Sequence, residues 1–128
     1  MSYCFSKIVP LSYDEAISKV TADLQEEGFG ILTEIDVKKK LKEKIGVDFR
    51  KYKILGACNP PYAYKALQAE PHIGTMLPCN VVVQELESGD IEVSAIDPLA
   101  SMMAVHNEDL GVIAKEIQAK LKKVIDAL

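Results

Sequence analysis

Side chains that bind soft or borderline metal ions are concentrated in the middle and C-terminal part of this 128-residue chain. They are Cys58, His72, Met76, Cys79, Met102, Met103 and His106. Thiolate, thioether and imidazole groups together suit Zn²⁺ or Cu⁺. Their spacing contains no Cys-x-x-Cys or His-x-x-x-His pair. Packing of sulfur-containing side chains in a hydrophobic core would account for the cysteines and methionines without a metal ion. A metal ion would therefore need ligands that the fold brings together, and we expect Cys58, Cys79 and His72 in that role.

The two cysteines flank predicted strand ends that we expect to meet. If the predicted strands 52–57 and 80–86 are antiparallel neighbours, Cys58 and Cys79 lie close together. With Ser88-Gly89 as a two-residue turn, Asn80 pairs with Asp97 and shares a face with it, whereas Cys79 points to the other face. The sequence therefore predicts a site at one edge of the sheet.

Asn59-Pro60-Pro61 is typical of a helix start, with a capping side chain followed by proline. Free backbone donors and the positive end of the helix dipole at this point would favour a small anionic ligand and lower the pKa of a nearby thiol. A reversible disulfide, a thiol nucleophile and a pair of inert core thiols all remain open for Cys58 and Cys79. Asp97, which precedes Pro98, is typical of a turn residue and not of a general base.

Apolar periodicity and turn signals predict five strands with intervening helices. The strands are expected over residues 3–9, 30–36, 52–57, 80–86 and 91–96. Helices are expected after the capping box Ser12–Glu15, after Asp36 as far as Gly46, from Asn59 to near Glu70, and after Asn107, with a short helical turn over residues 99–105. The predicted class is α+β, in the order β-α-β-β-β-β-α with short helical insertions. We expect two long helices to pack on one face of a mainly antiparallel sheet and residues 1–128 to form a single domain.

Composition and charge narrow the functional classes. The formal net charge is −4, so we expect no nucleic-acid binding. The first ten residues lack the pattern of a signal peptide, and apolar runs are only a few residues long, so we expect no membrane association. Three cysteines are too few for a disulfide scaffold and favour a cytoplasmic protein.

Residues 38–53 hold eight basic and two acidic residues, whereas residues 66–114 hold eight acidic and no basic ones. This distribution indicates either a solvated helix face or a docking patch for an anion or a second copy.

Three blocks and one dipeptide carry a resemblance to a known family. They are Ile54-Leu-Gly-Ala-Cys-Asn-Pro-Pro61, Ala66-Leu-Gln-Ala-Glu-Pro71, Leu77-Pro-Cys-Asn-Val-Val-Val83 and Asp97-Pro98. With these blocks the chain resembles the domain-of-unknown-function family 302 over nearly its whole length. The resemblance implies a curved antiparallel sheet backed by helices, similar to the fold of TATA-box-binding protein, and a homodimer. It implies no agreed activity. Positions that match the motif are candidates for a shared site or a shared core: Cys58, Asn59, Pro60, Glu70, Pro71, Leu77, Pro78, Cys79, Asp97 and Pro98.

Our first functional hypothesis is a non-enzymatic, dimeric module that binds or senses a small ligand or a metal ion such as Zn²⁺ or Cu⁺. Its ligand-binding residues would be Cys58, Asn59, Glu70, Cys79, Asn80 and Asp97. A second hypothesis is a thiol-dependent enzyme or redox protein that acts on a small anionic substrate with the same cysteines. A third is a structural or interaction protein without a site.

Overall fold

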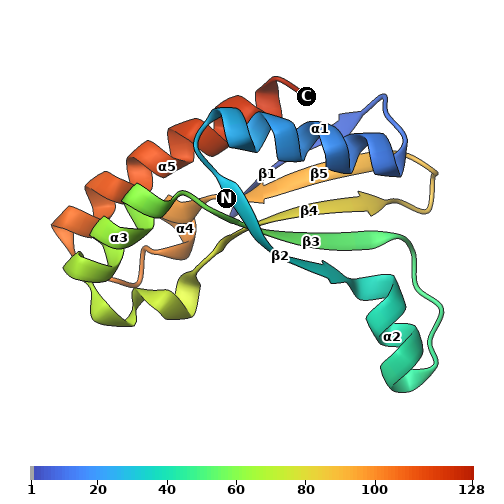
Figure 1. Cartoon of the computed structure of the whole chain (residues 1–128), viewed down its shortest axis with the longest axis horizontal. Helices are drawn as coiled ribbons and strands as arrows, with labels where there is room; N and C mark the ends of the chain where they lie inside the picture. Colours follow the sequence, from blue (N-terminus) through green and yellow to red (C-terminus); the bar gives the residue numbers. More distant parts are fainter. Residues whose placement is uncertain (1) are drawn as a thin grey trace.

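In the computed structural model, which describes residues 2–128, five strands form one antiparallel sheet in the spatial order β1-β5-β4-β3-β2 (Figure 1). The strands are β1 (Cys4–Val9), β2 (Gly30–Asp36), β3 (Tyr52–Cys58), β4 (Cys79–Glu85) and β5 (Ile91–Ile96). They agree with the predicted strands to within about one residue at each end, as the period-two alternation dictates. The predicted α+β class is confirmed.

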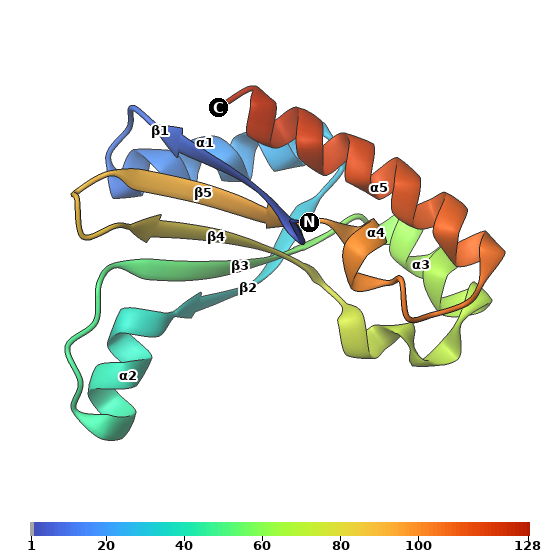
Figure 2. The same ribbon diagram turned by 180° about the vertical axis from the view of Figure 1, so that it is seen from behind.

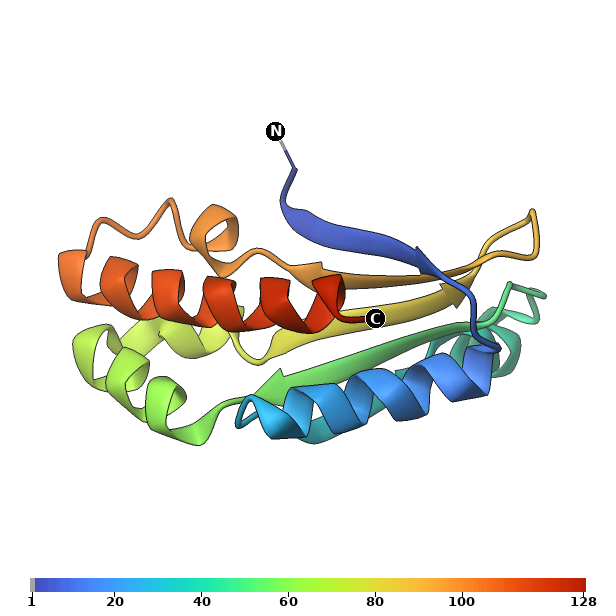
Figure 3. The ribbon, with the colours of Figure 1, turned by 90° about the horizontal axis from the view of Figure 1, so that it is seen from above.

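Two long helices, α1 (Tyr13–Glu26) and α5 (Glu108–Asp126), cover one face of the sheet (Figure 3). Helix α1 begins at the predicted capping box, in which the Ser12 hydroxyl accepts a bond from the Glu15 amide and the Glu15 carboxylate accepts one from the Ser12 amide. Helix α5 begins at Asn107, whose side-chain oxygen accepts a bond from the Leu110 amide. These caps fix where each helix begins, and the apolar stripe of each helix packs against the sheet.

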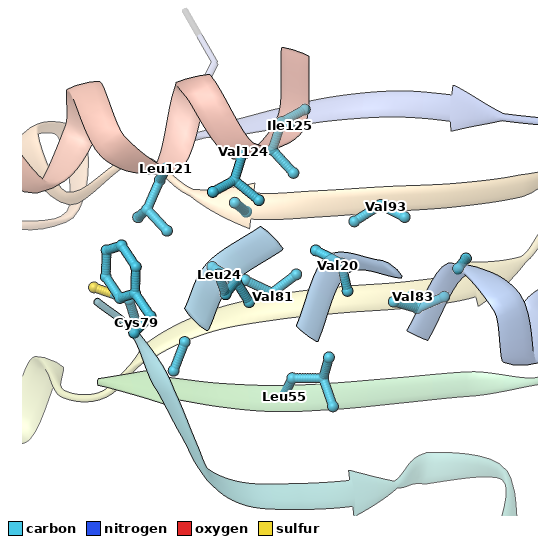
Figure 4. Packing of buried hydrophobic residues seen from close by; sticks show 14 of the residues in the cluster. Val20, Leu24, Leu55, Cys79, Val81, Val83, Val93, Leu121, Val124 and Ile125 are labelled. Carbon is cyan, nitrogen blue, oxygen red and sulfur yellow. The ribbon is translucent and has the colours of Figure 1, made fainter. Parts of the chain in front are cut away.

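The core fills the layer between the sheet and these two helices (Figure 4). Alternate residues of β4, namely Cys79, Val81 and Val83, point into this layer and are buried. Leu24 of α1 and Leu121 of α5 meet them from the helix side. The opposite face of the sheet is left without a covering layer of helices.

Shorter helices extend beyond the sheet at its two ends (Figure 2). The helices α3 (Pro60–Ala69) and α4 (Pro98–Ser101), with the 3₁₀ turn η1 (Pro71–Met76), gather beside the first half of α5. Helix α2 (Val37–Ile45) projects from the other end, starts at the capping carboxylate of Asp36 and ends at Gly46 in the left-handed conformation. Helices α2 and α3 correspond to predicted insertions, and α4 occupies the start of the helical turn predicted over residues 99–105, whereas η1 was not predicted.

The predicted two-residue turn between β4 and β5 is wrong. Glu87, Ser88 and Gly89 form a three-residue loop closed by a bond from the Leu86 amide to the Asp90 carbonyl, and Gly89 has a φ of 90°. Three-residue loops with a left-handed glycine are a common hairpin type. The pairing register consequently moves by one residue, and because side chains alternate across a strand, this shift changes which face a residue occupies.

None of the helices in the described part of the chain combines the length and apolar character needed to span a bilayer.

Candidate functional site

Cys58, Asn59 and Cys79 line one small cavity at the end of the sheet where α3 begins. Cys58 is the last residue of β3 and Cys79 is the first residue of β4, and Ala57 pairs directly with Cys79. The two cysteines are thus brought to one place, as predicted from the antiparallel pairing. The cavity has a free volume of about 20 Å³, which is enough for one water-sized group.

The remaining walls of the cavity are almost entirely apolar. They come from the turn before β2, the strand β3, the segment before β4, the helices α3 and α5, and the end of α4: Phe29, Ala57, Ala63, Ala66, Leu77, Pro78, Met102, Leu110, Ile113 and Ile117. Two separate hydrophobic clusters meet here, one between the sheet and the long helices and the other among α3, α4 and α5. The thioether of Met102 is therefore a third sulfur-containing side chain in the wall.

Both thiols have raised pKa values. Burial, with a smaller Coulombic contribution from Cys58, raises the pKa of Cys79 to about 11. Burial also raises the pKa of Cys58, which is partly exposed. The expected lowering by the α3 N-terminus is therefore wrong, and both thiols are protonated and weakly nucleophilic at neutral pH.

The start of α3 differs from the prediction in its capping. The side chain of Asn59 makes no capping bond; its Nδ2 instead donates to the Glu27 carbonyl at 3.1 Å, at the C-terminal end of α1. Pro60 and Pro61 have no amide hydrogens, so this helix end offers fewer backbone donors than an ordinary one. This helix start is therefore a poorer anion-binding site than an ordinary helix N-terminus.

Glu70 and His72 lie away from the thiols, at the start of η1. The imidazole Nδ1 of His72 is 3.8 Å from a carboxylate oxygen of Glu70, and the His72 side chain is 93% exposed. Residues 2–128 contain no group of three or more His, Cys, Asp and Glu side chains that could hold a metal ion. The structure therefore does not assemble the predicted trio of Cys58, Cys79 and His72.

Asn80 and Asp97 do not line the thiol cavity, and they do not pair with each other. Because Val81 pairs with Ala95, Asn80 does not pair with Asp97, and it lies on the uncovered face of the sheet. Asp97 caps α4 by accepting a bond from the Leu99 amide and also accepts bonds from Gln118 of α5 at 3.0 and 3.2 Å. The prediction that these two residues share a face is wrong, and Asp97 is a structural residue.

Met102 is one of the soft side chains noted in the sequence, but its proximity to the cysteines was not predicted. Its position depends on how α4 folds back against α5, which no local pattern encodes. Phe29 was missed as well. Phe29 lies between Gly28 and β2, and β2 is the neighbour of β3, which ends at Cys58. This position could have indicated that Phe29 lies near the cysteines.

Comparison with known proteins gives a family and a solved relative. The sequence profile of the family described as "Domain of unknown function DUF302" matches residues 5–128. The crystal structure of an uncharacterized conserved protein DUF302 from Bacillus stearothermophilus is similar to this chain, with a TM-score of 0.91 and 30% sequence identity. The similarity covers 98% of each chain. No curated protein matches the sequence.

Proposed function

This chain belongs to the DUF302 family, and from that premise we propose that it is a non-enzymatic module that binds one Cu⁺ ion through the thiolates of Cys58 and Cys79. The observation that carries the proposal is the cavity itself. Two thiols and one thioether line a space with room for a single water-sized group, and its wall contains no carboxylate or imidazole.

The ligand set selects among metal ions. Thiolate and thioether ligands suit soft ions such as Cu⁺. Structural Zn²⁺ takes four ligands in a tetrahedral arrangement, drawn from thiolate, imidazole and carboxylate groups. Cys58 and Cys79 provide only two of those, and the third sulfur, in Met102, is a soft thioether. The cavity thus favours Cu⁺ over Zn²⁺.

The protonation state of the thiols favours binding over catalysis. Because burial raises the pKa of both cysteines, neither supplies a ready thiolate nucleophile at neutral pH. A bound metal ion must displace both protons, so metal affinity rises with pH. Below both thiol pKa values, the association constant for Cu⁺ should increase by about two log units per pH unit, since two protons leave per ion bound.

The test is an anaerobic titration of the reduced protein with Cu⁺ against a chromogenic Cu⁺ chelator at several pH values. We expect one ion per chain and a steep rise in affinity with pH. Cys58→Ser and Cys79→Ala should each abolish stoichiometric binding, and Met102→Leu should weaken it. Cys4→Ser is the matched control, because Cys4 lies on the uncovered face of the sheet. Circular dichroism of each variant confirms that it is folded.

Three results would contradict the proposal: no stoichiometric Cu⁺ uptake, uptake that survives Cys58→Ser, or equal loss in the Cys4→Ser control. Parallel titration with Zn²⁺ separates the two metal classes. Tighter binding of Zn²⁺ than of Cu⁺, each relative to a chelator of known affinity, would contradict the assignment to a soft monovalent ion.

A further inference from the structure

Asn59, which directly follows Cys58, is the only polar residue that is buried within residues 2–128, at 8% exposed. The bond from its Nδ2 to the Glu27 carbonyl joins the start of α3 to the end of α1 (Figure 3). Burying an amide has a desolvation cost that an apolar residue would avoid. The hydrogen bond offsets this cost and fixes the position of the backbone beside Cys58.

The sheet holds Cys58 on one side only. The pairing of β3 with β4 ends at Ala57 and Cys79, and the residue before Cys79 is Pro78, which has no amide hydrogen to donate. Cys58 therefore pairs with β2 alone. Cys79, by contrast, belongs to the core cluster between the sheet and the long helices. The Asn59 bond thus supplies a constraint on Cys58 that the sheet does not.

The end of α1 that accepts this bond is itself held by α5. The Glu27 carboxylate lies 3.9 Å from Nζ of Lys120 and 3.2 Å from Nζ of Lys123, and the Glu27 side chain is 17% exposed. The next residue, Gly28, has a φ of 88°, and a Cβ there would lie 3.1 Å from Nδ2 of Asn59. The contact between α1 and Asn59 is therefore close, and its α1 side is fixed in place.

We propose that Asn59 is a positioning residue for the metal site, whose bond to Glu27 holds Cys58 where it can share a Cu⁺ ion with Cys79. This role rests on the proposed function, since it requires that the two thiols bind one ion. The Asn59 amide group is engaged by the Glu27 carbonyl, so Asn59 acts through Cys58 and not as a ligand. Removing a group that orients a metal ligand typically lowers metal affinity by about 10–100-fold.

Anaerobic titration of the reduced full chain with Cu⁺ against a chromogenic chelator tests this role. Asn59→Leu keeps the approximate size of the side chain and removes the donor, so the Cu⁺ dissociation constant should rise by about tenfold or more. Gly28→Ala forces a Cβ against the same amide and should weaken binding too. The affinity should still change by about two log units per pH unit in both variants, because both thiolates still bind.

Ser12→Ala is the matched control. It removes the helix cap at the opposite end of α1, so it destabilises the same helix and should leave the Cu⁺ dissociation constant at the wild-type value. The double variant Gly28→Ala with Asn59→Leu should bind no more weakly than Asn59→Leu alone, because both changes act on one contact. Circular dichroism confirms that each variant is folded.

The possible failures are distinguishable. Absence of Cu⁺ uptake by the wild type would refute the proposed function, and the role of Asn59 with it. Uptake by the wild type with an unchanged dissociation constant in Asn59→Leu would overturn the positioning role alone. An equal loss of affinity in Ser12→Ala would assign the effect to general destabilisation, which also overturns that role.

Discussion

The thiol of Cys79 should make the stability of the protein depend on pH in the alkaline range. Burial raises the pKa of Cys79 from an ordinary value of 9.0 to about 11. Because the folded-state value lies above the unfolded-state value, the neutral thiol contributes its full stabilisation below pH 9. That contribution is lost as the pH rises towards 11, where the unfolded chain ionises more readily. One pKa unit corresponds to about 1.4 kcal/mol. The free energy of unfolding should therefore fall by about 1 kcal/mol between pH 8 and pH 10, and by about 2 kcal/mol by pH 11.

Urea denaturation of the reduced protein at a series of pH values measures this effect. Lysine and tyrosine side chains also titrate in this range, so the informative quantity is the difference between the wild type and Cys79→Ala at each pH. That difference should shrink by about 2 kcal/mol between pH 8 and pH 11. Cys58→Ser removes only the smaller, Coulombic cause of the shift and should keep most of the pH dependence. A difference that is constant with pH would refute the burial of this thiol.

Four substitutions test the structural contacts of Gly56, Asn59 and the Asp97–Gln118 pair by urea denaturation at neutral pH. Gly56→Ala should destabilise the fold by about 1–3 kcal/mol, because a Cβ there would clash with the Thr33 hydroxyl oxygen and lie 2.9 Å from Cγ of Pro78; unchanged stability would contradict this close approach. Asn59→Asp should cost about 1–3 kcal/mol, because a carboxylate cannot donate to a carbonyl, whereas a simple capping role would leave it nearly neutral. Asp97→Ala should cost about 1–2 kcal/mol and Gln118→Ala less, since only the first removes a helix cap; the reverse order would argue against the cap.

The elements of the fold could be predicted because their signals are local. The capping box at Ser12, the capping carboxylate of Asp36 and the left-handed Gly46 each fix a helix end through bonds within a few residues. The alternation in Cys79–Glu85 fixes which side of β4 is buried. These features do not depend on distant parts of the chain, so the sequence contains all that is needed to find them.

The candidate site was predicted less completely because it depends on register and on long-range packing. The hairpin loop has three residues instead of two, so Asp97 does not pair with Asn80. The residues Glu87-Ser-Gly-Asp90 are compatible with either loop length. Asn59 has the residue type of a helix cap, but its amide reaches α1, which is 32 residues away in sequence. The residue type at position 59 predicted a hydrogen bond to the helix that follows, whereas the side chain bonds to the Glu27 carbonyl.

The residues of the family motif divide by what the fold does with their polar groups. Asn59 joins the start of α3 to the end of α1, and Asp97 joins β5 to α4 and α5, so their polar side chains are occupied by structural bonds. Cys58 and Cys79 are free thiols that share a cavity with Met102 where two hydrophobic clusters meet. A packing role alone would be met by alanine or valine without the cost of burying ionisable groups. The reason for having sulfur at both positions is therefore best sought in what sulfur binds.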